Sequence, residues 1–317
     1  MSTAFVFPGQ GSQSTGMLGE LARSEPVVEA TFAEASEVLG YDLWALCQQG
    51  PDSELAVTEK TQPAMLAAGV ATWRALQSHR QLRAAAMAGH SLGEYSALVC
   101  SEALDFRVAV DLVRHRGQLM QQAVPIGQGA MAAVLGLDDA EVEAACAEAA
   151  GSEVVEAVNF NAPGQVVIAG HATAVARAIE VAKGRGAKRA VLLPVSVPSH
   201  SSLMRGAAER LAGKLATTEL RRPLVPDVYT VDVRRHADPE GIRVALKEQL
   251  YKPVRWADTV RAMLASGVTT IVECGPGRVL TSLNRRVARD PGLTLLAVDD
   301  PESLARVLAA SQESTDA

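Results

Sequence analysis

The chain has few aromatic residues and few cysteines. Only 4% of its 317 residues are Phe, Trp or Tyr, while 48% are hydrophobic, so the core must consist mostly of Ala, Leu and Val. The four cysteines are scattered, and none is paired with another Cys or with a His at a metal-ligand spacing. We therefore expect reduced core cysteines in a cytoplasmic protein that holds no metal.

An excess of positive charge and long apolar runs are also missing. The formal net charge of −6 argues against a nucleic-acid-binding protein, which needs a basic face. No stretch reaches the roughly 20 apolar residues of a membrane-spanning helix. The first residues, MSTAFVFPGQ, place no charged segment before a long apolar run, unlike a signal peptide. We expect neither nucleic acid nor a membrane among the partners.

Short apolar segments alternate with helical patterns in both outer parts of the chain. The alternation predicts an α/β fold, with a mainly parallel sheet that is covered by helices on its faces. The expected strands span residues 4–7, 84–88, 268–273 and 293–298, and the expected helices span 26–39, 62–77, 91–99, 105–123, 202–215, 238–250 and 256–265.

The middle of the chain has a different order of elements. Strands are expected at 131–135, 154–160, 166–169 and 189–193, with helices near 139–149 and 173–185. The resulting β-α-β-β-α-β order is that of a ferredoxin-like unit. We predict a large α/β domain formed by residues 1–126 and 196–317, into which a small subdomain of residues 127–195 is inserted.

A serine lies between two glycines at the end of the second expected strand. Gly89-His90-Ser91-Leu92-Gly93 fits G-x-S-x-G, in which a sharp strand-to-helix turn exposes a nucleophilic hydroxyl. The backbone N–H of Leu92 would lie at a helix N-terminus, where it can stabilise an oxyanion. The alternative is a helix cap: Ser91 would then form a capping box with Glu94, three residues later.

A serine nucleophile needs a base, and His200 is the best candidate among six histidines. It lies in VSVPSHSS, between an expected strand and an expected helix, where an α/β sheet presents its ligand sites. The alternative is an ordinary residue at a helix entry. Because no Asp or Glu between Ser91 and His200 is a convincing third member, we predict a dyad whose imidazole is oriented by a backbone carbonyl.

Two other features are candidates for the same site. FPGQGSQ at residues 7–13 is a Gly-rich turn after the first strand, but it lacks both G-x-G-x-x-G and a P-loop lysine. Its Gln10 is a candidate for the second half of an oxyanion hole, through the side-chain amide. Arg116 lies on a helix face that also carries apolar residues. It is either a surface residue with an apolar stem or, in a pocket, a bidentate clamp for a carboxylate.

Several motifs together resemble those of a known family. In order, they are FPGQGSQ, TQPA at 61–64, GHSLGEYSAL, the RG of HRGQLM, NFNAPGQVVIAG, PVSVPSH and ECGPG. The chain resembles the malonyl-CoA:acyl carrier protein transacylases from about residue 4 to about residue 298. This resemblance implies a hydrolase-like α/β core that carries a ferredoxin-like insert, in agreement with the elements expected above.

The resemblance also implies roles for single residues. Ser91 matches the acylated nucleophile and His200 its general base, whose ring the main-chain carbonyl of Gln249 would orient. Arg116 matches the clamp for the free carboxylate of a malonyl group. The residues expected to line the pocket are Gln62, Met120, Met131, Asn161 and Val279.

The family's oxyanion hole is formed by two backbone N–H groups, which correspond to Gln10 and Leu92. One departure from the family lies in VPDVYTVDV, where Tyr229 and Thr230 replace an Asn of many relatives. The stretch VPSH, which ends at His200, resembles that of stand-alone fatty-acid enzymes and differs from the motifs usual in modular polyketide acyltransferases, which favours malonyl over methylmalonyl substrates.

The implied reaction is a ping-pong acyl transfer for fatty acid biosynthesis. Ser91 takes the malonyl group of malonyl-CoA and releases CoA, and the phosphopantetheine thiol of holo-acyl carrier protein then takes the group. No cofactor is expected, and a monomer is expected. Because carrier proteins are acidic, a basic patch must receive them; the candidate residues, whose alternative is an ordinary solvated face, are Lys183, Arg185, Lys188 and Arg189.

Other functions remain open at this point. The same active site would serve a stand-alone acyltransferase that loads a polyketide synthase carrier protein. A serine thioesterase or hydrolase on the same core would admit water and would have no use for Arg116. A non-catalytic scaffold would be favoured by alanine at position 91 or 200, and neither position carries one.

Overall fold

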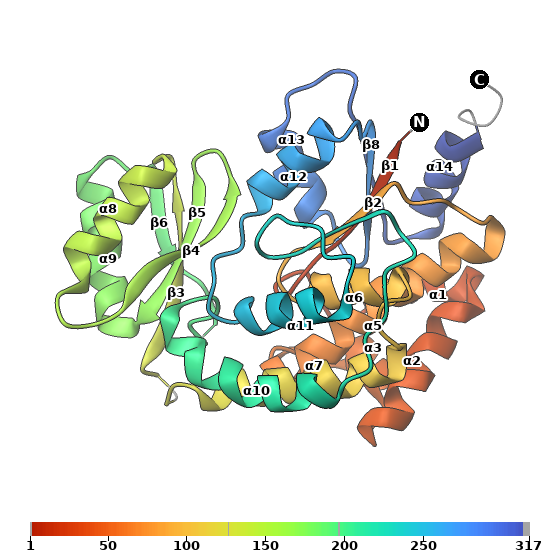
Figure 1. Cartoon of the computed structure of the whole chain (residues 1–317), viewed down its shortest axis with the longest axis horizontal. Coiled ribbons are helices and arrows are strands. Elements are labelled where there is room, and N and C mark those ends of the chain that lie inside the picture. Colours follow the sequence, from red (N-terminus) through yellow and green to blue (C-terminus); the bar gives the residue numbers. More distant parts are fainter. Residues whose placement is uncertain (1, 126, 196, 313–317) are drawn as a thin grey trace.

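The computed structural model describes residues 2–125, 127–195 and 197–312. It is an α/β structure with two separate sheets (Figure 1). The larger sheet has five strands, and all of its pairings are parallel, as predicted. In sheet order its strands are β7 (Asp227–Tyr229), β2 (Ala86–Gly89), β1 (Thr3–Phe7), β8 (Thr270–Cys274) and β9 (Thr294–Val298).

Helices cover both faces of this sheet. Helix α5 is buried along most of its length and packs against α2, α6 and α7, because its five alanines and Gly69 let neighbouring helices approach closely. The helices of the outer chain segments are α1 (Gly19–Ser24), α2 (Pro26–Leu39), α3 (Leu43–Gln49), α4 (Asp52–Leu55), α5 (Thr58–His79), α6 (Gly93–Cys100), α7 (Phe106–Gln122), α10 (Arg205–Thr217), α11 (Pro239–Glu248), α12 (Trp256–Ala265), α13 (Val279–Val287) and α14 (Pro301–Gln312), with a 3₁₀ turn at Ser202–Met204.

The middle of the chain forms the smaller, antiparallel sheet, at the left of Figure 1. Its strand order β4-β5-β3-β6 is that of a ferredoxin-like unit, which confirms the predicted fold class. A core of its own lies between the sheet and two helices. Its elements are β3 (Gly129–Leu135), α8 (Asp139–Ala150), β4 (Val155–Ala162), β5 (Gln165–His171), α9 (Ala172–Gly184) and β6 (Arg189–Leu192).

Strand β4 connects the two parts of the molecule. The amide of Phe160 donates to the Val254 carbonyl at 2.9 Å, and the amide of Val254 donates to the Val158 carbonyl at 2.8 Å. The predicted boundaries of the insert fall at residues 126 and 196, which lie outside the described residues, so the division into domains stays a prediction. No helix in the described ranges is long and apolar enough to cross a bilayer.

The predicted helices differ from the structure mainly at their ends. Helix α6 begins at Gly93, two residues after the expected start, because the chain is still turning at Ser91. Helix α5 begins at Thr58, four residues before the expected start, and contains Pro63. Helices α1, α3, α4, α13 and α14 were not predicted, since most are too short to show a clear apolar period.

Candidate active site

The turn between β2 and α6 holds Ser91 in an uncommon backbone conformation. Its φ of 52° lies in the left-handed region, which residues other than glycine avoid. A Cβ on Gly89 would come within 1.8 Å of the Gly93 carbonyl carbon, and a Cβ on Gly93 within 2.0 Å of the Phe7 oxygen. Both glycines of the motif are therefore required for the sharp turn that presents the serine.

The hydroxyl of Ser91 meets His200. Ser91 Oγ lies 2.7 Å from His200 Nε2, and His200 Nδ1 lies 2.7 Å from the carbonyl oxygen of Gln249. Because a carbonyl only accepts, Nδ1 must carry the proton, which leaves Nε2 free to accept one. Burial, followed by the charge of Arg116, lowers the pKa of His200 to about 3, although the hydrogen bond to Gln249 opposes this shift. The ring is thus neutral and poised as a base.

The surroundings of His200 and Ser91 correct two sequence-based interpretations. Strand β6, which precedes His200, belongs to the small antiparallel sheet, so His200 does not follow a strand of the parallel sheet. Its backbone is fixed instead by donation of its amide to the Leu250 carbonyl at 2.9 Å. The capping-box alternative for Ser91 is also wrong: the N-cap of α6 is Leu92, and the hydroxyl of Ser91 contacts His200.

Arg116 lies on α7 with its side chain directed into the interior, 1% exposed. Its Nη2 donates to Gln249 Oε1 at 2.9 Å, and its guanidinium carbon lies 5.6 Å from the centre of the Tyr95 ring. Its Nε has no acceptor within the described part of the chain. Burial lowers the pKa of Arg116, but a guanidinium stays charged at neutral pH. The site therefore contains a buried cation with unused donors.

Sequence reasoning missed a buried carboxyl group, Glu94. The side-chain Nε2 of Gln249 donates to Glu94 Oε2 at 2.6 Å and to the Ser91 carbonyl at 2.9 Å. Burial raises the pKa of Glu94 to about 8, and its bond to Gln249 opposes the shift. Glu94 falls inside the recognised motif, but nothing in the sequence indicates that Gln249, 155 residues away, would meet it.

The two backbone amides predicted to form the oxyanion hole, those of Leu92 and Gln10, belong to segments that meet at the serine turn. Leu92 is the residue at the N-terminus of α6. Gln10 follows Gly9, where an added Cβ would come within 2.5 Å of the His90 carbonyl oxygen, so the loop after β1 lies against the serine turn. Neither amide donates to an acceptor in the described ranges. No contact that the structure provides favours the side chain of Gln10 for this role.

The residues expected to line the pocket are only partly brought together. Gln62 Nε2 on α5 donates to the sulfur of Met120 on α7 at 3.4 Å, one helical turn beyond Arg116. Asn161 Oδ1 lies 2.8 Å from Nε2 of His90, the neighbour of Ser91. The remaining two are Met131, buried on β3, and Val279, the exposed first residue of α13; their part in the pocket stays a prediction.

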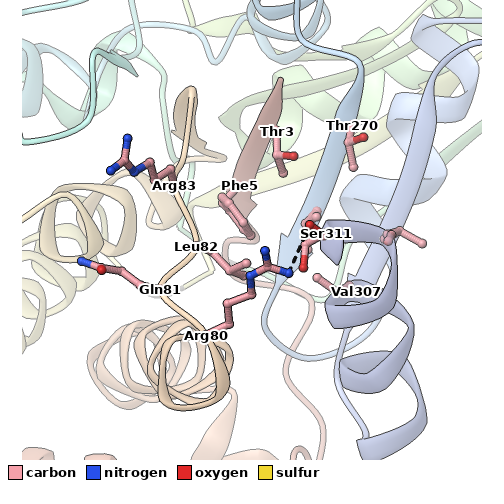
Figure 2. A pocket seen from close by; sticks show the side chains of 12 residues that line it. Thr3, Phe5, Arg80, Gln81, Leu82, Arg83, Thr270, Val307 and Ser311 are labelled. Atoms are coloured by element: carbon pink, nitrogen blue, oxygen red, sulfur yellow. Dashed lines mark hydrogen bonds between the residues drawn. The ribbon is translucent and has the colours of Figure 1, made fainter. Parts of the chain in front are cut away.

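Two cavities help to place the site within the fold. One, of about 460 Å³, reaches His200 between α8, β4 and the 251–253 segment, and is also lined by Arg205 and Tyr251. Another lies near Arg80, whose guanidinium reaches the Ser311 backbone (Figure 2). That pocket is bounded by Thr3 at the start of β1, whereas Ser91 follows the carboxyl ends of the parallel strands. The candidate chemistry therefore lies at the carboxyl edge of the sheet, opposite the pocket of Figure 2.

The strained serine, its neutral histidine partner and the parallel α/β core fit an enzyme with a serine nucleophile, and comparisons with known proteins identify the class as acyltransferase. Residues 4–309 match the acyl transferase domain family. The malonyl CoA-acyl carrier protein transacylase of Escherichia coli (strain K12) is 56% identical over 305 residues, covering 96% of this chain and 98% of the relative. The chain thus belongs to the acyl transferase family and, within it, to the malonyl CoA-acyl carrier protein transacylases.

Solved structures give the same result. An acyl carrier protein S-malonyltransferase from Vibrio cholerae superposes with a TM-score of 0.93 at 56% identity, covering 97% of this chain and all of that one. A malonyl-transacylase in complex with its type II PKS acyl-carrier protein superposes with a TM-score of 0.96 at 54% identity, with 98% and 100% coverage.

Proposed function

We propose that this chain transfers the malonyl group of malonyl-CoA to the phosphopantetheine thiol of holo-acyl carrier protein, for fatty acid biosynthesis, through a malonyl ester of Ser91. The observation that carries the proposal is the pairing of Ser91 with neutral His200 at 2.7 Å beside a buried, incompletely paired Arg116. The names of the relatives support the same substrates.

In the first half-reaction His200 Nε2 takes the proton of Ser91 as the hydroxyl oxygen attacks the thioester carbonyl. The amides of Gln10 and Leu92 stabilise the oxyanion, at a helix N-terminus that favours negative charge. When the C–S bond breaks, the imidazolium returns its proton to the leaving CoA sulfur. Ser91 then carries the malonyl group, and the ring is neutral again.

The second half-reaction repeats these steps with the carrier's thiol. His200 takes the thiol proton, the sulfur attacks the ester of Ser91, and the serine oxygen recovers the proton as it leaves. Because one thioester is exchanged for another, we expect an overall equilibrium constant near unity.

Arg116 is proposed to pair with the free carboxylate of the malonyl group. Its unused guanidinium donors suit bidentate recognition of a carboxylate in a dry pocket. An acetyl group would leave this buried cation incompletely paired, so the clamp favours malonyl through the cost of the wrong substrate.

Of the four basic residues predicted to receive the acidic carrier protein, two are less suitable in the folded structure. The charges of Lys183 and Arg185 are already offset by nearby carboxylates, namely Glu180, Glu141 and Glu148. Lys188 and Arg189 form no ion pair within the described residues. Arg286 of α13 donates to Gln165 Oε1 at 2.5 Å, and Gln165 and Arg189 flank the same residue of β3. We infer that Lys188, Arg189 and Arg286 receive the carrier.

Charge reversal tests this patch. Arg189→Glu should raise KM for holo-acyl carrier protein severalfold and leave KM for malonyl-CoA unchanged, whereas the control Lys183→Glu should affect neither. Equal effects of the two substitutions on the carrier's KM would contradict the assignment.

Intact-protein mass after brief mixing with malonyl-CoA tests the function itself. We expect a malonyl adduct that disappears when holo-acyl carrier protein is added, with malonyl-carrier as the product. Steady release of free malonate without transfer would indicate a hydrolase and would contradict the proposal.

A second candidate is the loading of a polyketide synthase carrier, which the similarity to a transacylase in complex with such a carrier favours. Rates of discharge to a fatty-acid carrier and to a type II polyketide carrier distinguish the two pathways. The cytoplasmic location, the monomeric state and the absence of a cofactor stay predictions.

A further inference from the structure

The Gln249 side chain joins three parts of the site that are distant in sequence. Its main-chain carbonyl orients His200, and its side-chain Oε1 accepts from Arg116. Its Nε2 uses both of its hydrogens, one on the Ser91 carbonyl and one on Glu94. Gln249 is completely buried, so none of these contacts is shared with water at the surface.

The contacts of Oε1 and of Nε2 together determine the orientation of the Gln249 side-chain amide. With Oε1 toward the guanidinium of Arg116 and Nε2 toward Glu94, every contact pairs a donor with an acceptor. A rotation of the amide by 180° would place Nε2 against the guanidinium and Oε1 against two oxygens. The contacts with the Arg116 guanidinium and with the Ser91 carbonyl oxygen would then be repulsive, and repulsion is strong in a buried site.

We propose that Glu94 is a positioning residue, which holds the Gln249 side chain so that Arg116 is aimed at the malonyl carboxylate. This inference rests on the proposed function and adds to it the group that sets the clamp. Glu94 does not touch the substrate: it acts through Gln249 on Arg116 and on the backbone of Ser91.

A structural role for Glu94 alone would require a better-satisfied carboxyl group. Its Oε1 has no partner with good hydrogen-bond geometry in the described part of the chain, and its Oε2 accepts from Gln249. The backbone of Val231 also lies close enough to lower the pKa of this carboxyl group. A buried carboxyl with so few bonds reduces stability. The contact with Gln249 is therefore what the residue provides.

Two substitutions of similar size separate the acceptor from the volume of the side chain. Glu94→Gln keeps an oxygen that can accept from Gln249, whereas Glu94→Met removes it. We measure acylation of the enzyme by malonyl-CoA and by acetyl-CoA. Glu94→Met should lower malonyl acylation about 10- to 100-fold, the range for leaving a buried donor, here Nε2 of Gln249, without its acceptor. Acetyl acylation, which does not use the clamp, should fall less than about threefold, and Glu94→Gln should remain near wild type.

A double-mutant cycle provides a readout that a purely structural role would not change. Gln249→Leu removes the amide and keeps the main-chain carbonyl that orients His200. Once the amide is lost, Glu94→Met should add almost nothing to the loss in malonyl acylation. If Glu94→Met does not fold, Gln249→Leu breaks the same bond from the other side and should show the same malonyl-selective loss. Glu25→Gln, a buried carboxylate paired with His79 elsewhere in the fold, is the control and should leave both rates unchanged.

Parallel losses with both acyl groups, or additive effects in the cycle, would overturn the proposal for Glu94. These outcomes are distinct from failure of the proposed function, in which the wild-type protein would itself form no malonyl adduct.

Discussion

The turns after β2 and β8 flank β1 in the sheet, and they resemble each other closely. Both connect a parallel strand to a helix through glycines, and a buried carboxyl group whose pKa is raised by burial lies beside each turn, Glu94 in α6 and Glu273 in β8. Near the end of β8, Glu273 accepts three hydrogen bonds from the start of α13: from the amide of Leu280 and from the amide and hydroxyl of Thr281, at 3.0, 2.7 and 2.8 Å. After β2, Glu94 in the first turn of α6 accepts one well-formed hydrogen bond, from the Gln249 side chain, and the Val231 backbone lies nearby.

The backbone conformations of the two turns differ too. In the turn after β8 the positive φ angles belong to Gly275 and Gly277, which adopt them without strain. In the turn after β2 a positive φ belongs to Ser91. A satisfied carboxyl and unstrained glycines are sufficient to connect a strand to a helix. The strain and the incompletely paired groups around Ser91 therefore indicate a second requirement, which is catalysis.

The largest effect is expected from Ser91→Ala. It removes the acylated oxygen and leaves the fold intact, because Ala meets the same backbone strain as Ser at this φ. Malonyl transfer should fall by about 10⁴-fold or more, measured as malonyl-carrier formed per minute. Ser282→Ala, which removes an exposed hydroxyl of α13, should leave the rate unchanged. If malonyl transfer fell by a similar factor in both variants, the catalytic role would no longer be specific to the turn after β2.

Glycine substitutions should separate the two turns in stability. Gly89→Ala places a Cβ 1.8 Å from backbone, so the variant should fail to fold or lose several kcal/mol. Gly277→Ala has no atom within 4 Å of the new Cβ and only a φ of 76° to accommodate, at a cost of about 1 kcal/mol. Urea titration gives both free energies of unfolding; equal values would mean that the β2 turn is no more constrained than the β8 turn.

Arg116→Ala should change selectivity more than stability. We expect kcat/KM for malonyl-CoA to fall about 100-fold, because a buried charge pair with the substrate is lost, while acetyl acylation stays the same or rises. The matched control is Arg107→Ala, at an exposed ion pair with Glu37. A decrease of equal size for acetyl-CoA would mean that Arg116 supports the dyad and does not recognise the carboxylate.

The smallest expected effect is the change in acylation rate when the pH is lowered from 7 to 5. Since burial lowers the pKa of His200 to about 3, its ring is neutral above pH 5, and kcat/KM for acylation should change less than about twofold from pH 7 to pH 5. The same shift affects stability: the unfolded chain protonates this histidine near pH 6.5 and the folded chain does not. Its contribution to stability is therefore complete above pH 6.5 and decreases as the pH falls toward 3. If kcat/KM for acylation instead fell on the acid side with a midpoint near pH 6.5, this result would contradict the lowered pKa of His200.

The sequence was sufficient to predict the fold class, with all strands except β7, most of the longer helices and the ferredoxin-like order of the middle segment, and it marked Ser91 as the candidate nucleophile. These follow from local patterns: apolar runs ended by Gly or Pro, and a serine between glycines. The motifs carried over from the family selected Gln249, which no local pattern marks. Short helices such as α3 and α4 were missed because they span too few turns to show a period.

What the sequence did not reveal depends on contacts between distant segments. His200 was selected for the wrong reason, since the strand before it belongs to the other sheet. The bond between Glu94 and the Gln249 side chain joins residues far apart in the chain, and the local capping pattern gave Glu94 a plausible but wrong role. The pairing of Lys183 and Arg185 with acidic residues likewise becomes visible only in the folded molecule.

The most direct test of the account is to locate the malonyl group. The wild-type protein is mixed with malonyl-CoA for seconds, quenched in acid and digested, and the modified peptide is sequenced by mass spectrometry. The account predicts a single malonyl ester, on Ser91, which is absent from the same peptide after holo-acyl carrier protein has been added. A malonyl group on another residue, or an adduct on Ser91 that the carrier does not remove, would contradict it.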